Sequence, residues 1–233
     1  MLIMSLAAVE AMAGTENLGG VQLWENGPYW AECNVGATKP EEYGYYFWWG
    51  DTVGYTPDGG TCNKATYSGV TWVSSAGEQM NNSPFTSCTT WGKDNSALQS
   101  AGYIDSTGNL VAAHDAATAH LGALWRMPTH AEFSTLISKC TTMWITTNGV
   151  AGRLVTGRGD YADKSIFLPA AGYGDGSHFT FPGSHGIYWS SSPYSDYSGN
   201  AWFLQFIDSA SFHQYNDTRI GGHTIRPVRG FAK

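Results

Sequence analysis

The stretch at residues 128–140 has the pattern of an amphipathic helix. Thr129 and Glu132 are spaced as a capping box, in which each residue binds a free backbone N–H of the first turn. Apolar residues then recur at helical spacing, at Phe133, Leu136, Ile137 and Cys140. We expect a helix that packs one face on the rest of the protein.

A second helical stretch precedes it at residues 115–125. Its alanine-rich composition favours a helix, His114 or Asp115 could cap its start, and Gly122 could end it. It also has one apolar face. The sequence therefore predicts two helices near the middle of the chain.

From residue 141 onward the pattern changes to short apolar segments separated by Gly, Asn and Asp, as in an antiparallel sheet. Two further segments near the start of the chain, VQLWE and YWAECNV, flank the turn signal Asn26-Gly27-Pro28 and predict a hairpin. Together these patterns predict an α+β fold with two helices, a small twisted antiparallel sheet and long loops. The later segments are MWITT, GRLVTG, SIFLPAAGY, GIYWSSS, NAWFLQFI and TIRPVRGF.

The segment NAWFLQFI, residues 200–207, is apolar on both of its alternating faces. Leu204 and Phe206 share a face with Trp202, and we expect this face to pack in the core. The opposite face would then present Phe203, Gln205 and Ile207 to the outside. Apolar side chains on an exposed face are what a recognition surface would show.

Residues 51–110 have little periodicity and are rich in Gly, Thr, Ser, Asn and Asp with scattered aromatic residues. Such long loops are uncommon in compact domains. We interpret this region either as an insertion held by its own aromatic residues or as a functional loop. We assign one domain to residues 21–233 and interpret residues 1–20 as a tail or the remnant of a longer chain.

Composition narrows the possible functions. The net charge of -7 disfavours nucleic-acid binding, and no apolar run is long enough to span a membrane. Between Lys164 and Arg219 there is no Lys or Arg, although Asp175, Asp196, Asp208 and Asp217 fall there. The region 184–223 combines Tyr and Trp with Ser, Gly and Asn, a composition close to that of an antibody paratope.

Sequence motifs for catalysis and metal binding are missing. HExxH, GxSxG and phosphate-binding glycine loops do not occur, and the four cysteines lack zinc-site spacing. Cys62 and Cys88 could form a disulfide, or all four thiols could be unpaired. A hydrolase that uses His213, Asp217 and His223 stays as one alternative.

Five ordered motifs resemble a known family. They are Trp125-Arg-Met-Pro-Thr129, Glu132-Phe133, SIFLPAAGY, GIYWSSSPY and Arg226-Pro-Val228. Together they look like the bacterial major paralogous domain proteins first named from Fibrobacter, over residues 21–230. The resemblance implies a C-type lectin fold and a likeness to the variable proteins of diversity-generating retroelements.

In those variable proteins, adenine-templated mutagenesis rewrites codons near the C-terminus, and the altered side chains bind the ligand. The resemblance thus implies a variable region at about 184–224 and a stable frame around it. The frame would consist of Trp189, Leu204, Phe206, Arg219, Arg226 and Pro227. The implied ligand-binding residues are Ser184, His185, Phe203, Gln205, Ile207, His213, Gln214, Tyr215, Asp217, Thr218, Ile220 and His223.

Two departures from related proteins limit the function. Sulfatase-activating relatives use C-terminal cysteines, and this chain has none after Cys140. The EPN, QPD and WND triplets of calcium-dependent sugar-binding lectins are also missing, so we expect no cofactor, although loop oxygens could hold a structural calcium ion.

The sequence therefore favours a non-enzymatic ligand- or receptor-binding domain of the adhesin or phage tail type. We expect it to be extracellular, on a bacterial cell surface or a phage virion, and to bind a protein or glycan receptor on another cell. We expect no nucleic-acid partner and no membrane span, and the sequence leaves the oligomeric state open. The main alternative is a static carbohydrate-binding module of a bacterial surface protein.

Overall fold

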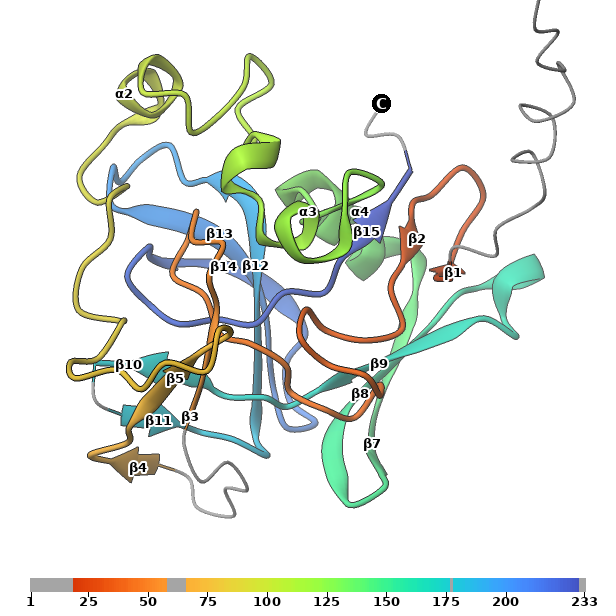
Figure 1. The fold of residues 1–233 in the computed structure, drawn as a ribbon. Coiled ribbons are helices and arrows are strands. Elements are labelled where there is room, and N and C mark those ends of the chain that lie inside the picture. Colours follow the sequence, from red (N-terminus) through yellow and green to blue (C-terminus); the bar gives the residue numbers. More distant parts are fainter. Residues whose placement is uncertain (1–18, 58–65, 177, 231–233) are drawn as a thin grey trace, which may run out of the picture.

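The computed structural model describes residues 19–57, 66–176 and 178–230 (Figure 1). In these residues the fold is rich in β-strands, which form five small antiparallel sheets, and it has three short α-helices. The expected α+β C-type lectin fold, with two helices and a single small sheet, is wrong. The apolar segments after residue 141 separate into several sheets, and further strands form where the sequence shows no alternation.

The central sheet consists of β12 (His185–Pro193), β13 (Asn200–Ile207) and β14 (His213–Thr218), with β13 in the middle. The sequence predicted β12 and β13 but missed β14. Because β14 lies at the edge of the sheet and its sequence HQYNDT is polar except for Tyr215, it lacks the apolar alternation of a covered strand.

The other four sheets surround this one (Figure 1). The first joins the predicted N-terminal hairpin, which is confirmed, to strands from the middle and end of the chain. It contains β1 (Val21–Gln22), β2 (Tyr29–Trp30), β15 (Val228–Arg229) and β6 (Trp125–Arg126). The remaining sheets are β7 (Thr141–Thr147), β8 (Val150–Thr156) and β9 (Ser165–Pro169); β10 (Tyr173–Asp175), β11 (His178–Thr180) and β4 (Thr66–Ser68); and β3 (Tyr55–Pro57) with β5 (Trp72–Ser74).

Both predicted helices form. In α4 (His130–Lys139) the capping box is present as expected, with the Thr129 hydroxyl accepting from the Glu132 backbone N–H. In α3 (Ala116–Leu121) Asp115 is the N-cap, and its carboxylate accepts a 2.9 Å hydrogen bond from the Thr118 N–H. Gly122 ends α3 with φ 86°, a left-handed conformation that favours glycine.

The described part of the region 51–110 forms strands and a helix, which favours the interpretation of an insertion held by its own aromatic residues. It contains β3, β5 and the unpredicted helix α2 (Asn95–Ser100), whose single buried residue gives no helical pattern. Trp72 and Phe85 pack edge to face, with ring centroids 4.7 Å apart. Phe85 also fills the space above Gly174 and Gly222, so the insertion is anchored on the central part of the domain.

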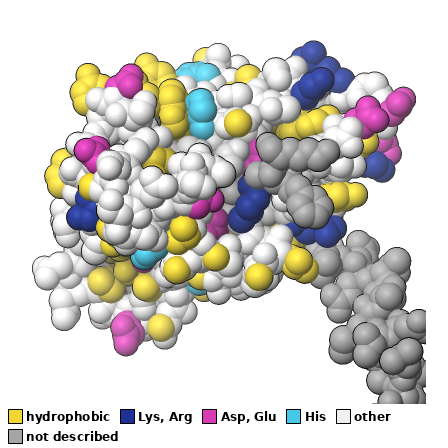
Figure 2. Space-filling model, turned by 90° about the horizontal axis from the view of Figure 1, so that it is seen from above, with side chains coloured by type: hydrophobic (Ala, Val, Ile, Leu, Met, Phe, Trp, Pro, Cys, Tyr) yellow, Lys and Arg dark blue, Asp and Glu magenta, His cyan; other side chains and the backbone are white. Residues whose placement is uncertain are grey.

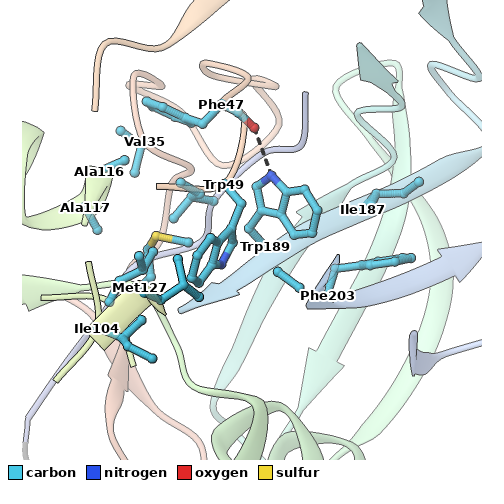
Figure 3. Close-up of a cluster of buried hydrophobic side chains, with 14 residues drawn as sticks. Val35, Phe47, Trp49, Ile104, Ala116, Ala117, Met127, Ile187, Trp189 and Phe203 are labelled. Carbon is cyan, nitrogen blue, oxygen red and sulfur yellow. Dashed lines mark hydrogen bonds between the residues drawn. The ribbon is translucent and has the colours of Figure 1, made fainter. Parts of the chain in front are cut away.

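Two hydrophobic cores lie on opposite sides of the central sheet. Tyr188, Leu204 and Phe206 belong to a core that also takes in Phe133 and Leu136 of α4. Trp189 and Phe203 belong to a second core with Phe47 and Trp49, which Figure 3 shows from close by. The central sheet is therefore covered on both sides over part of its length.

The surface carries few charges. Only 13% of all residues are charged, and the face seen in Figure 2 is mostly uncharged, with charged side chains in the minority. In the part of the chain that the structure describes, no helix has the length and apolar character needed to cross a membrane.

Candidate ligand-binding face

The register of the central sheet places most of the predicted ligand-binding residues on one side. Phe203 pairs with Trp189 on one neighbour and Tyr215 on the other, and Gln205 pairs with His213. Because side chains alternate along a strand, all of these side chains lie on one face of the sheet. We call it the front face. It consists of His185, Ile187, Trp189, Ala201, Phe203, Gln205, Ile207, His213, Tyr215 and Asp217.

Exposure varies strongly across the front face. Phe203 is only 4% exposed, which corrects the expectation that it faces the outside. Gln205, Ile207 and His213 are half-buried, and Tyr215 is 57% exposed. Phe203 was misassigned because alternation shows which residues share a face, whereas the cover over Phe203 comes from residues distant in sequence.

His223 supplies part of that cover. Its ring stacks on Trp189 with centroids 3.9 Å apart and meets Phe203 edge to face at 5.2 Å. His223 is 0% exposed, so the expectation of an exposed His223 is also wrong. Neither ring nitrogen has a hydrogen-bond partner within the described chain, although Nε2 lies 3.5 Å from Oδ2 of Asp217.

Burial and their mutual contact together set the charges of His223 and Asp217. Burial lowers the pKa of His223, and the neighbouring Asp217 only partly opposes this effect. Burial alone would raise the pKa of Asp217, but His223 and the Thr218 backbone N–H together hold it below its ordinary value. Near neutral pH the site therefore contains a neutral imidazole beside a carboxylate.

The structure places four predicted residues away from the main group. Gln214 points to the back face, where its Nε2 donates a 2.7 Å hydrogen bond to the Ser134 hydroxyl of α4. Thr218 also lies on the back by register, and Ile220 follows the end of β14. Ser184 lies at the start of β12, with its hydroxyl 2.9 Å from Nδ1 of His185.

A continuous series of aromatic contacts crosses the front face. The successive centroid distances are 4.3 Å from His185 to Phe181, 6.3 Å to Tyr173, 6.0 Å to His223, 5.2 Å to Phe203, 6.4 Å to Tyr215 and 5.4 Å to His213. We call these rings the aromatic arc. His223 and Phe203 form its buried middle, while the rings at both ends are half-buried or exposed.

Sequence reasoning missed Tyr173 and Phe181. Both precede the region that the resemblance marked as variable, and the pattern gave no reason to bring them to the front face. The one available signal was Tyr173 at the end of the SIFLPAAGY motif. Its side chain is half-buried beside His223, so part of the site comes from a different sheet, through β10.

The predicted frame residues are all buried. Arg226 shows how such a polar residue is accommodated, because its guanidinium donates to the Asn34 side chain and to the carbonyls of Ala31, Glu32 and Phe167. The Trp189 indole donates a 2.8 Å hydrogen bond to the Phe47 carbonyl (Figure 3). The front face is thus held by side chains with fixed partners.

The described residues bring no metal-binding cluster together. There, no group of three or more His, Cys, Asp or Glu side chains is placed to hold a metal ion. Cys33, Cys88 and Cys140 are free thiols. Cys62, the other half of the possible Cys62–Cys88 disulfide, lies outside the described residues, as does most of the expected tail.

Comparisons with known proteins give one assignment. Searches of curated proteins and of solved structures returned no match. Residues 25–229 match the model of the Lcl C-terminal domain, which describes bacterial surface and secreted proteins. This match covers the central sheet, the insertion and the whole aromatic arc. The chain belongs to the Lcl C-terminal domain family.

Proposed function

We propose that this protein is a non-enzymatic ligand- or receptor-binding domain, and that the exposed part of its front face contacts the ligand. It would act outside the cell, on a bacterial surface or a phage virion, and bind a protein or glycan receptor on another cell. The observation that carries the proposal is the aromatic arc. Its outer rings are accessible at the edge of a sheet whose back is packed in the core.

Physical arguments favour binding at this place. Aromatic side chains offer a large, rigid contact area at low entropic cost, and here they come with half-buried polar neighbours such as Gln205 and His213. The enzymatic alternative has less support. It would use His213, Asp217 and His223, and the His223 side chain is 0% exposed beneath the face, out of reach of a substrate.

The resemblance to variable proteins adds a finer proposal, namely diversification of this face by a retroelement. The exposed and half-buried positions Gln205, Ile207, His213 and Tyr215 could change with little effect on the core. Phe203 and His223 could not, because both rings are buried and pack against each other and against Trp189. The diversified set would therefore be smaller than the sequence predicted.

One observation on DNA tests diversification. We expect a near-copy of the DNA encoding residues 184–226 beside a reverse transcriptase gene, differing mainly at adenines in the codons of the exposed set. Sequencing the locus decides the matter. Absence of such a copy would show that the face is static and would leave ligand binding to be tested separately.

Cell binding tests the ligand-binding proposal directly. A fluorescent, multivalent form of the domain would be screened against a panel of bacterial and host cells. Tyr215→Ala should abolish the binding seen with the parent. Tyr197→Ala is the matched control, because Tyr197 is 66% exposed but lies on the connection between β12 and β13, outside the aromatic arc. Equal loss in both variants would contradict the proposal.

A glycan array separates the main alternative, a static carbohydrate-binding module. Aromatic rings can also stack on sugars, so the array should show a discrete specificity that Tyr215→Ala removes if the ligand is a glycan. If cells bind but no glycan does, the receptor is a protein. Treatment of the cells with protease gives the complementary result.

A further inference from the structure

The carboxylates of the C-terminal half gather around the aromatic arc. Asp217 lies on the front face with its Oδ2 3.5 Å from Nε2 of His223, and Asp175 lies two residues after Tyr173 on β10. Burial raises the pKa of Tyr173, and the negative charges of these two aspartates raise it further. Asp208 acts in the same way on His185 at the other end of the arc, where it opposes the lowering of the pKa by burial. Three acidic residues, from β10, from the turn after β13 and from β14, thus lie around one surface.

Asp175 and Asp217 form no ion pair with a Lys or Arg among the described residues. Within the described residues the ion pairs join Arg126 to Glu132, Lys164 to Asp163 and His223 to Asp217. Burial keeps His223 neutral near pH 7, so the charge of Asp217 is not balanced. The interval from residue 165 to residue 218 also contains no Lys or Arg.

One arginine comes near this region, from β8. Arg153 acts electrostatically on Asp208, but its guanidinium is buried at 6% exposure and donates a 3.0 Å hydrogen bond to the Ser211 carbonyl. It is therefore fixed below the turn between β13 and β14. It leaves the charges of Asp175 and Asp217 unbalanced at the front face.

His223 is the second, independent sign that a partner belongs here. It is fully buried, both of its ring nitrogens lack hydrogen bonds within the described chain, and its Nε2 is directed at Asp217. A buried polar ring without hydrogen bonds is costly. A donor bound to the Asp217 carboxylate would lie beside this ring and strengthen the polar network around it.

We propose that the aromatic arc recognises a Lys or Arg side chain on a protein partner. This inference rests on the proposed function and specifies its ligand. Aromatic faces attract cations through the ring quadrupole, and a carboxylate beside them adds a charge-assisted hydrogen bond. Tyr215 and Tyr173 would supply the faces, and Asp217 and Asp175 the charge. Phosphate-rich partners such as nucleic acids would be repelled by the same carboxylates.

A pair of peptides that differ only in charge tests the proposal. The isotope-labelled protein is titrated with acetyl-Gly-Arg-Gly-amide and with the same peptide carrying neutral citrulline, and resonances are followed by NMR. We expect the arginine peptide to shift the resonances of Tyr173, His213 and Tyr215, and the citrulline peptide to shift them much less. Added salt should weaken the effect.

Three aspartate-to-asparagine substitutions test which carboxylate contacts the bound arginine. Asp217→Asn should weaken binding of the arginine peptide about tenfold, as expected for loss of a charge-assisted contact, and Asp175→Asn should weaken it less. Asp196→Asn is the control, because Asp196 is an exposed aspartate of the same interval that bonds Ser195 and Tyr194 away from the arc. Thermal melting confirms that each variant is folded.

The outcomes separate the two proposals. Equal shifts from both peptides, no shift from either, or unchanged binding in Asp217→Asn and Asp175→Asn would each overturn the cation proposal. If Tyr215→Ala still abolishes binding to cells in that case, the proposed function stands and only the ligand class is wrong. If Tyr215→Ala has no effect on cell binding either, both fail.

Discussion

The two faces of the central sheet are built from the same three strands but differ in what covers them. On the back, Tyr188, Leu204 and Phe206 are each 0% exposed against α4 and the β7–β9 sheet. On the front, exposure rises from 0% at Trp189 to 57% at Tyr215. The back face can therefore hold the fold, while the edge of the front face is free to bind.

This difference is visible within the single strand β13. Leu204 and Phe206 point to the covered part of the back, while Phe203 and Gln205 point to the front, one buried and one half-buried. The front face thus contains a structural half and an accessible half. Substitutions along the arc should show where the boundary falls.

The largest expected effect is on the back face. Phe206→Ala should lower the free energy of unfolding by about 3–5 kcal/mol, the usual cost of emptying a buried phenylalanine site. The ring packs directly over Gly186 and beside Tyr188, with ring centroids 6.1 Å apart in the latter pair, so the cavity has little means to close. Chemical denaturation measures the effect. A loss below about 1 kcal/mol would contradict the packing described.

Phe203→Ala tests the buried half of the front face. We expect a loss of about 3 kcal/mol, at the lower end of the same range, because Tyr215 beside it can move to fill part of the space. Chemical denaturation compared with Phe206→Ala gives the ranking. If Phe203→Ala were as stable as the parent, the whole front face would be available for binding, as the sequence alone predicted.

The pH dependence of stability tests the burial of His223. Because the folded pKa of His223 lies below its value of about 6.5 in the unfolded chain, the unfolded chain binds more protons as the pH falls below that value. Stability should thus fall from pH 7 to pH 5, by up to about 1.4 kcal/mol per unit of pKa shift. In His223→Gln, the melting temperature should therefore fall less between pH 7 and pH 5 than it does in the parent protein.

Other groups titrate in the same pH range, so the contribution of His223 is the difference in pH dependence between the parent and the His223→Gln variant. Burial also lowers the pKa of His130 and of His185. Part of the dependence of stability on pH should therefore remain in the variant. His178→Gln is the matched control, because His178 lies exposed on β11. Identical slopes for the parent and His223→Gln would show that His223 is accessible to water.

The sequence predicted local elements of the fold better than contacts between distant segments. The capping box at Thr129 and Glu132, the end of α3 at Gly122 and the strands β12 and β13 follow from residues adjacent to them. The division into five sheets could not be predicted, because it depends on which distant strands pair. The polar strand β14 likewise becomes a strand only through its pairing with β13.

For the candidate site, too, the local arrangement could be predicted from the sequence and the long-range contacts could not. Alternation correctly placed Phe203, Gln205 and Ile207 on one face. It could not show that His223 covers Phe203, because His223 lies outside the central sheet, in a segment that a backbone bridge joins to Phe47. Tyr173 and Phe181 were missed for the same reason, since they reach the arc from outside the central sheet.

The smallest effect on stability is expected at the accessible edge of the front face. Tyr215→Ala should change the free energy of unfolding by at most about 0.5 kcal/mol, because the ring is 57% exposed and its contacts with Phe203 and His213 are at the surface. The same substitution should abolish binding to cells. Denaturation and cell binding measured on one preparation give both values. A large loss of stability would make Tyr215 part of the structural half, and the accessible surface would then be too small for the recognition face proposed.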